Sequence, residues 1–195
     1  MALYSIGYGN RDIGTFVKLL QQQQTDILVD VRSKPHSGYQ EDYNRGQLND
    51  TLSKNSIRYQ WMGDLLGGRP QQANLYDQEG YVDYLACQED FLFTQGFVQL
   101  EELDSGGMVV ALMCSELRPE QCHRSRLLGE GLSKRGFDLN HIDERGNLIS
   151  QQEVVLRITG GQESLLGLSP SSPLARSDRP IGGELFSPGS DPLGS

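Results

Sequence analysis

The sequence has neither an excess of basic residues nor a long apolar run. Its 17 Lys and Arg are outnumbered by 26 Asp and Glu, which gives a formal net charge of -9. This balance excludes a broadly basic surface for nucleic-acid backbones, although it leaves room for a local basic pocket. No stretch approaches the roughly 18 consecutive apolar residues that a membrane span requires, so we expect no membrane partner.

Cysteine is scarce, with three residues in a chain of 195. An odd number cannot form a complete set of disulfides within one chain, and reduced thiols are typical of the cytosol. The first residues also lack the charged-then-apolar pattern of a secretory signal. We therefore predict a cytoplasmic protein with free thiols.

Apolar residues become sparse towards the C-terminus. From position 160 onward, 20 of the 36 residues are Gly, Pro or Ser, which leaves too little apolar surface to offset the entropy of ordering the segment. We predict one domain over residues 1–158 and a flexible Gly/Ser/Pro-rich tail over residues 159–195. A binding arm for a partner is the alternative interpretation of this tail.

Short apolar runs alternate with amphipathic segments over residues 1–158. For example, the apolar residues at positions 13, 16, 17 and 20 follow helical spacing behind Asp12, a suitable N-cap. This alternation predicts a three-layer α/β domain in which helices flank a mostly parallel sheet. The predicted strands are 3–7, 27–31, 57–61, 108–113 and 138–142, and the predicted helices are 13–20, a short one at 48–52, one or two within 81–103, and 123–135 ended by Gly136.

The connection MCSELRPEQCHRSR, residues 113–126, follows the most strand-like run of the chain. Ligands bind beyond the carboxyl ends of parallel strands, and a thiolate here would be stabilised by a helix start, a histidine and guanidinium groups. We interpret Cys114 as a nucleophile, Cys122 as a resolving or second thiol, and His123 or His36 as the group that moves protons. The alternative is that Cys114 is a small buried residue that closes a strand.

The same connection could hold an anion or a metal. Arg124 and Ser125 lie near a predicted helix start, where anions bind. The tyrosine-phosphatase loop requires Cys-x5-Arg, and positions 120 and 128 hold Glu and Leu, which excludes that loop. The two cysteines and the histidine would supply three zinc ligands without any Cys-x2-Cys spacing, and His36 or Glu116 would have to complete the shell. We therefore predict no resident metal, and zinc is the less favoured alternative.

Polar loops also follow the neighbouring predicted strands. Tyr39, Tyr43 and Trp61 could stack on a base or another ring, whereas Cys87 lies among apolar residues and is predicted to be core. The predicted binding residues in these loops are Arg32, Ser33, Tyr39, Gly67, Gly68 and Arg69, and those in the cysteine segment are Glu116, Arg124 and Ser125.

Four motifs resemble, in order along the chain, the signature of the DUF488 family. They are SIGYGNR at 5–11, VDVRSKP at 29–35, LGG at 66–68, and MCSE with CHRS at 113–125. The resemblance implies a small α/β domain of unknown function with a site at the paired cysteines, and it adds Asn10 to the binding residues. In the first motif, Tyr8 and Gly9 replace the His and Ser that are usual in the family. If that histidine is an acid or base in relatives, Tyr8 or another group must act here.

A weaker resemblance, at the level of the fold, is to rhodanese domains. There an Asp-Val-Arg run follows one strand and a cysteine loop follows another, as at Asp30–Arg32 and Cys114–Ser125. The cysteine loop is longer here than in rhodaneses, so sulfur transfer is only an analogy.

These observations predict a thiol-dependent transferase or hydrolase that acts on an anionic small molecule, a nucleotide or a nucleic-acid end. The competing hypothesis is a non-catalytic module that binds a nucleotide or nucleic acid through Arg32 and Arg124. Nothing in the sequence determines the oligomeric state.

Overall fold

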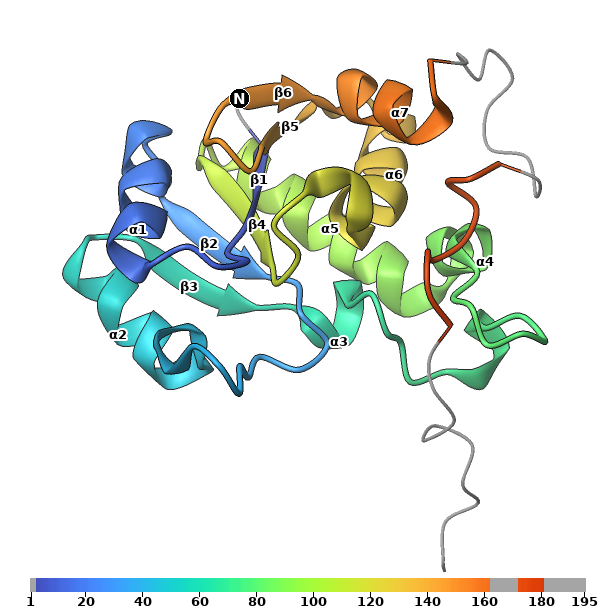
Figure 1. Cartoon of the computed structure of the whole chain (residues 1–195), viewed down its shortest axis with the longest axis horizontal. Helices are drawn as coiled ribbons and strands as arrows, with labels where there is room; N and C mark the ends of the chain where they lie inside the picture. Colours follow the sequence, from blue (N-terminus) through green and yellow to red (C-terminus); the bar gives the residue numbers. More distant parts are fainter. Residues whose placement is uncertain (1–2, 162–171, 181–195) are drawn as a thin grey trace, which may run out of the picture.

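Six strands form one sheet in the order β3-β2-β4-β1-β5-β6 (Figure 1). The computed structural model describes residues 3–161 and 172–180 of the chain. The first five strands run parallel, and only β6 is antiparallel to its neighbour β5. The strands are β1 (Leu3–Gly7), β2 (Ile27–Asp30), β3 (Arg58–Trp61), β4 (Val110–Cys114), β5 (Leu139–Ile142) and β6 (Leu148–Ser150).

Helices make the crossovers that parallel strands need. The α-helices are α1 (Ile13–Gln22), α2 (Arg45–Lys54), α3 (Gly63–Leu66), α4 (Tyr84–Glu89), α5 (Phe91–Ser105), α6 (Glu130–Lys134) and α7 (Gln151–Thr159). Three 3-10 turns, η1 (Glu41–Tyr43), η2 (Ala73–Leu75) and η3 (Pro119–Gln121), and one π-helical segment, η4 (Arg124–Gly129), complete the described elements.

Strand β4 is buried on both faces because two core clusters lie on either side of the sheet. Val110, Leu112 and Cys114 face one cluster, whereas Ala111 and Met113 face the other. A strand that is covered on both sides reads as a continuous apolar run rather than an alternating one, which is why this segment is so apolar in the sequence.

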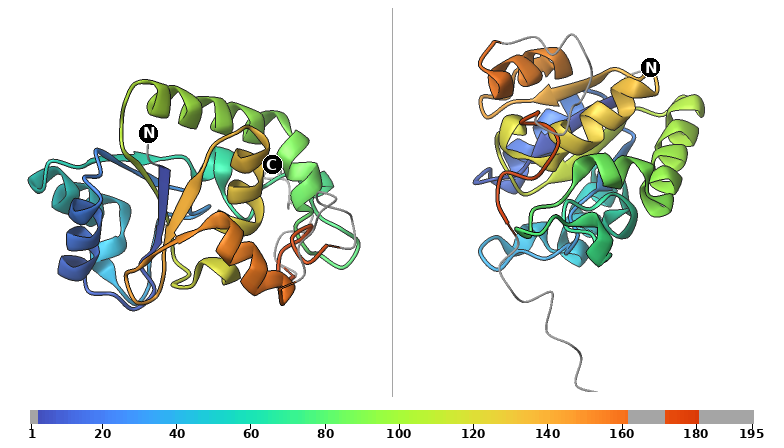
Figure 2. Two further views of the ribbon diagram at one scale, coloured as in Figure 1. Left: turned by 90° about the horizontal axis from the view of Figure 1, so that it is seen from above. Right: turned by 90° about the vertical axis from the view of Figure 1, so that its right-hand side faces the viewer.

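The two core clusters show which helices cover each face of the sheet. Helices α1 and α2 pack on one face through Phe16, Leu20, Leu48 and Leu52, while α3 to α6 and η4 cover the other face, on which α5 is the longest helix (Figure 2). The chain therefore leaves β1 towards the first face and leaves β4 towards the second.

The change of face creates a switch point between neighbouring strands. Strands β1 and β4 are paired, with Gly7 opposite Cys114 at their carboxyl ends. Open α/β sheets bind ligands at such points, because the loops leave the sheet in opposite directions there. The cysteine connection thus begins at the position where this architecture favours a site.

The predicted fold class and the mostly parallel sheet are confirmed. The helix predicted over 123–135 is present, but Arg124–Gly129 within it is the π-helical η4 and Glu130–Lys134 is the α-helix α6. Strand β6 and helix α7 were not predicted. Helix α7 begins with a capping box between Ser150 and Glu153 and ends at Gly160, whose φ of 65° lies in the left-handed region.

Part of the segment predicted as a flexible tail packs on the domain. Over residues 172–180, Leu174 and Ala175 are buried. The Ala175 carbonyl accepts from the Tyr84 amide, and the Val82 carbonyl accepts from the Ser177 amide. The remaining tail positions, 162–171 and 181–195, lie outside the described residues. Within the described part of the chain, no helix has the length and apolar character needed to cross a bilayer.

Candidate functional site

The two cysteines of the predicted site lie side by side, although eight positions separate them along the chain. Cys114 ends β4, and Cys122 lies between η3 and η4. The loop folds back so that both side chains join the same core cluster, with exposed fractions of 4% and 2%. Cys87, the third cysteine, is fully buried on α4, as predicted for a core residue.

Glu116 and His123 complete a compact group with the two sulfur atoms. Glu116 Oε2 lies 2.9 Å from Cys114 Sγ and 3.3 Å from Cys122 Sγ. His123 Nδ1 lies 3.7 Å and 3.6 Å from the same two sulfurs. Glu116 is exposed, whereas the other three residues are buried. The carboxylate therefore lies between the buried thiols and solvent.

Cys122 receives further donors from Arg124. The Arg124 Nε lies 3.2 Å from Cys122 Sγ, and the Arg124 backbone amide lies 3.5 Å from it. Burial raises the pKa of the Cys122 thiol, but the hydrogen bond from Cys114 and the positive charges of Arg124 and His123 outweigh burial. The pKa of Cys122 is left well below its ordinary value. These contacts favour the thiolate form of Cys122 over that of Cys114.

Cys114 and His123 carry the protons of the group. The hydrogen bond to Cys122, burial and the neighbouring negative charges raise the pKa of Cys114 well above its ordinary value. Burial lowers the pKa of His123, but the charge of Cys122 and its hydrogen bond outweigh burial and raise that pKa. These pKa directions favour the charge on Cys122, whereas the sequence prediction takes Cys114 as the nucleophile.

Arg124 is fully buried and anchors the loop to the sheet. Its Nη2 donates to the Glu116 carbonyl at 2.7 Å, and its Nη1 donates to Ser5 Oγ at 3.2 Å. The loop approaches β1 so closely that a Cβ on Gly7 would lie 1.8 Å from the Glu116 carbonyl oxygen. The guanidinium predicted to hold an external anion therefore has internal partners on every nitrogen.

A buried chain of polar side chains continues from Arg124 and was missed at the level of the sequence. Ser5 Oγ lies 2.6 Å from His141 Nδ1, and His141 Nε2 lies 2.7 Å from Gln151 Oε1. Because the Gln151 amide oxygen can only accept, the proton of the neutral imidazole is on Nε2, and Nδ1 accepts from the Ser5 hydroxyl. Burial lowers the pKa of His141 to about 4. The only sequence signal was a histidine in an apolar strand.

Gly67 and Gly68, from the LGG motif, allow their loop to pack closely against Ser33 and His123. A Cβ on Gly68 would lie 2.7 Å from His123 Cγ, and one on Gly67 would lie 2.5 Å from Ser33 Oγ. Ser33 Oγ in turn accepts from the Arg69 amide at 2.9 Å. These glycines are thus close-packing positions that align the His123 ring.

Arg32 lies at the end of β2 and pairs within the protein. Its guanidinium makes a bidentate contact with the buried Asp30, with Nη2 2.6 Å from Oδ2, and Nη2 also donates to the Tyr43 carbonyl. The Arg32 guanidinium carbon lies 5.3 Å from the Tyr8 ring centre, and that ring stacks on Tyr43 at 4.2 Å. Tyr8, which departs from the family pattern, therefore packs beside Arg32.

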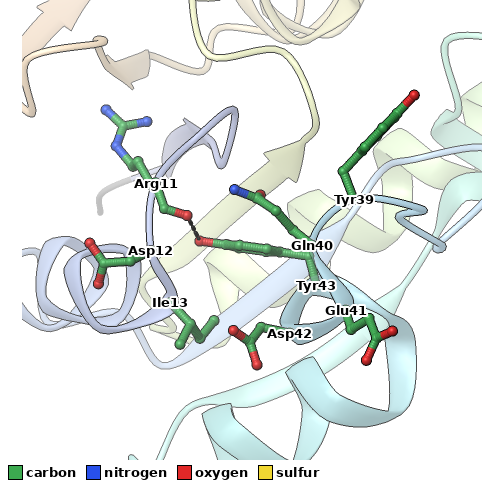
Figure 3. A pocket seen from close by; sticks show the side chains of 8 residues that line it. All are labelled: Arg11, Asp12, Ile13, Tyr39, Gln40, Glu41, Asp42 and Tyr43. Atoms are coloured by element: carbon green, nitrogen blue, oxygen red, sulfur yellow. Dashed lines mark hydrogen bonds between the residues drawn. The ribbon is translucent and has the colours of Figure 1, made fainter.

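Of the remaining predicted residues, Ser125 belongs to the cysteine connection and the others lie on other segments of the chain. Asn10, His36 and Tyr39 are exposed, and the Tyr39 side chain has essentially full exposure. Tyr39 lines a shallow hollow of about 360 Å³ with three carboxylate residues, Asp12, Glu41 and Asp42 (Figure 3). Trp61 donates to the Arg32 carbonyl. Ser125 Oγ donates to the Pro119 carbonyl and fixes the start of η4.

A comparison with protein-family models gives one result. The model described as "Domain of unknown function DUF488" matches residues 12–129. The chain belongs to the DUF488 family. This matched range of the DUF488 protein contains the Asp30–Arg32 strand end, Gly67–Gly68 and the whole cysteine connection. Searches among curated proteins and among solved structures give no match. None of these comparisons bears on the weaker resemblance to rhodanese domains.

Proposed function

We propose that this DUF488 protein is a cysteine-dependent transferase or hydrolase in which Cys122 is the reactive thiolate. The observation that supports the proposal most strongly is the set of three nitrogens around one buried sulfur: the Arg124 amide, the Arg124 Nε and His123 Nδ1, at 3.5, 3.2 and 3.6 Å. Donors of this kind stabilise a thiolate, which is the nucleophilic form of cysteine.

The reaction would have two steps. Cys122 Sγ attacks the electrophilic atom of the substrate, so that the new sulfur bond forms as the bond to the leaving group breaks, and His123 donates its proton to that group. Water or a second acceptor then breaks the sulfur bond, while neutral His123 takes up the released proton. Cys114 stays protonated and positions the thiolate through its hydrogen bond.

The substrate class that fits is an anionic small molecule, a nucleotide or a nucleic-acid end, in a reducing, cytoplasmic setting. His123 Nε2 and Arg32 Nη1 are among the buried donors that have no hydrogen-bond partner within the described residues. Both belong to the carboxyl edge of the sheet, where Arg69 is also exposed. Because the other nitrogens of Arg32 and Arg124 have internal partners, these groups are the ones we assign to the substrate anion.

Access to the sulfurs runs past Glu116, which is the exposed member of the group. Its carboxylate contacts both sulfurs, so its displacement would expose Cys122. Glu116 is thus a covering group rather than an anion-binding residue.

A pH series of iodoacetamide labelling, read by mass spectrometry, tests the thiolate. Cys122 should react at a nearly constant rate above about pH 6, and buried Cys87 is the internal control in the same spectra. A Cys122 that reacts only above about pH 8, as an ordinary thiol does, would overturn the proposal.

A panel of anionic electrophiles then tests catalysis. Phosphate esters, organic thiosulfates and nucleotides are incubated with the protein and the intact mass is measured. One class should leave an adduct on the wild type and on Cys114→Ser, but not on Cys122→Ser. Equal binding by the wild type and Cys122→Ser without any adduct would favour the non-catalytic binding module instead.

A further inference from the structure

Four metal-binding side chains of three chemical kinds converge at the switch point. The ligand atoms of Cys114, Glu116, Cys122 and His123 all lie within 4.8 Å of one another. Thiolate, imidazole and carboxylate are the ligands that Zn²⁺ takes in proteins, commonly as a set of four. We propose that this group binds one thiophilic divalent cation of the Zn²⁺ type, and that the bound ion holds Cys122 in a protected, unreactive form.

Four of the six distances between the ligand atoms can be compared with the edges of a coordination tetrahedron. Metal–sulfur bonds of about 2.3 Å and metal–nitrogen or –oxygen bonds of about 2.05 Å give sulfur-to-nitrogen or -oxygen edges of about 3.5 Å. The edges from His123 Nδ1 to the two sulfurs are 3.7 and 3.6 Å, and the edge from Glu116 to Cys122 is 3.3 Å. The Glu116–Cys114 edge is shorter, at 2.9 Å, and it belongs to the exposed side chain that can move most easily.

The surroundings supply the support that metal ligands require. The Arg124 amide and Nε both lie within 3.5 Å of Cys122 Sγ, and N–H donors to a ligating sulfur tune a metal site from outside its shell. Arg124 Nη2 also fixes the Glu116 carbonyl at 2.7 Å. The loop that carries Glu116 is therefore tied to Cys122 through the buried side chain of Arg124.

The formal charges balance when a divalent ion is present. Two thiolates and one carboxylate carry three negative charges, which the ion and the Arg124 guanidinium offset in full. A buried charge without such compensation is costly. Binding must displace the proton of the Cys114 thiol and the proton on His123 Nδ1, because cysteine coordinates as a thiolate and histidine as a neutral imidazole. The metal and an electrophilic substrate would therefore compete for the same sulfur.

Cobalt titration of the full-length, reduced and chelator-treated protein tests the site. The wild type should bind one Co²⁺ per chain with the intense visible bands of tetrahedral coordination and a thiolate-to-metal charge-transfer band. Cys114→Ser and Cys122→Ser should each weaken binding at least about tenfold and reduce the charge-transfer band. Cys87→Ala is the matched control and should bind as the wild type does.

Glu116→Gln keeps the test decisive if a cysteine variant fails to fold, because Glu116 is exposed. This variant should retain the thiolate band and bind Co²⁺ more weakly. Weak octahedral absorption by the wild type, or unchanged affinity in both Glu116→Gln and the double variant Cys114→Ser/Cys122→Ser, would overturn the metal site.

Labelling separates this inference from the proposed function. One equivalent of Zn²⁺ should slow iodoacetamide labelling of Cys122 at least about tenfold, and a chelator should restore it. A reactive Cys122 in a protein that binds no Co²⁺ would refute the metal site alone. Tetrahedral Co²⁺ binding by a protein whose metal-free Cys122 reacts as an ordinary thiol would refute the thiolate enzyme alone.

Discussion

Cys114 and Cys122 have the same burial but different partners. Both sulfurs contact the Glu116 carboxylate, which is closer to Cys114, but two nitrogens of Arg124 contact Cys122. A carboxylate favours a proton on the neighbouring thiol, and a guanidinium favours its loss. At the scale of single residues, the preference for a charge on Cys122 therefore depends on the orientation of the buried Arg124 side chain.

His141 gives a stability prediction with a defined pH window. Its pKa is about 4 in the folded protein and about 6.5 when unfolded, so between these values only the unfolded state binds the proton. Acidification from about pH 6.5 to pH 4 should therefore destabilise the fold, by about 3 kcal/mol in total from this group. Above about pH 6.5 the group contributes no pH dependence.

The measurement is urea unfolding at several pH values for the wild type and His141→Gln. The difference between the two pH profiles isolates His141 from the other titrating groups. Parallel profiles between about pH 4 and pH 6.5 would show that His141 is not held neutral in the folded state.

At the scale of elements, the site depends on close approaches that glycine permits. Gly68→Ala would place a Cβ 2.7 Å from His123 Cγ and should push the ring away from the sulfurs. The loss of one charge-assisted hydrogen bond, about 1.5–3 kcal/mol, should raise the pKa of Cys122 and move the onset of its iodoacetamide labelling about 1–2 pH units higher.

Gly46→Ala is the matched control for this substitution. Gly46 lies on α2 with open space around its Cα, and its φ is not positive. The change should leave labelling unaltered and raise stability by about 0.5–1 kcal/mol, as alanine does in helices. The same pH onset of labelling in Gly68→Ala and the wild type would show that His123 does not act on Cys122.

The parallel strands could be predicted because each is an apolar run followed by a polar loop. Strand β6 was not predicted because it has only three residues. Its pairing with β5 depends on the turn between them rather than on a hydrophobic pattern. Helix α7 was readable from its capping box, Ser150 to Glu153, but not from a strong apolar face.

The location of the site could be predicted from the sequence, but the contacts that distinguish Cys114 from Cys122 could not. The position of Cys114 and Cys122 on a strand-to-helix connection follows from sequence order alone. The direction of Arg124 does not, because it depends on Ser5, which lies 119 positions away. One partner of His141 is similarly remote, because Ser5 lies 136 positions away.

At the scale of the whole molecule, the last described segment, residues 172–180, packs against residues from the middle of the chain. Arg176 lies 3.1 Å from Glu79 and packs over the Tyr81 ring, while Arg126 donates to the Pro173 carbonyl. Exposed ion pairs of this kind contribute little on their own. The buried side chain of Leu174 should therefore provide most of the attachment.

Leu174→Asp should release this segment without unfolding the sheet. The Tyr84 amide, which donates to the Ala175 carbonyl, should then exchange its hydrogen faster, while amides of β4 keep their protection. Arg179→Ala, at an exposed position of the same segment, is the control. Unchanged exchange at Tyr84 in Leu174→Asp would contradict the attachment.

The central claim is that Cys122 is held as a thiolate by Arg124 and His123. It is tested most directly by titrating the ultraviolet absorbance of thiolate in the metal-free wild type, Cys114→Ser and Cys122→Ser. We predict about one thiolate per chain near pH 6 in the wild type and in Cys114→Ser, and none in Cys122→Ser. A wild-type protein whose thiolate absorbance appears only above about pH 8 would contradict the account.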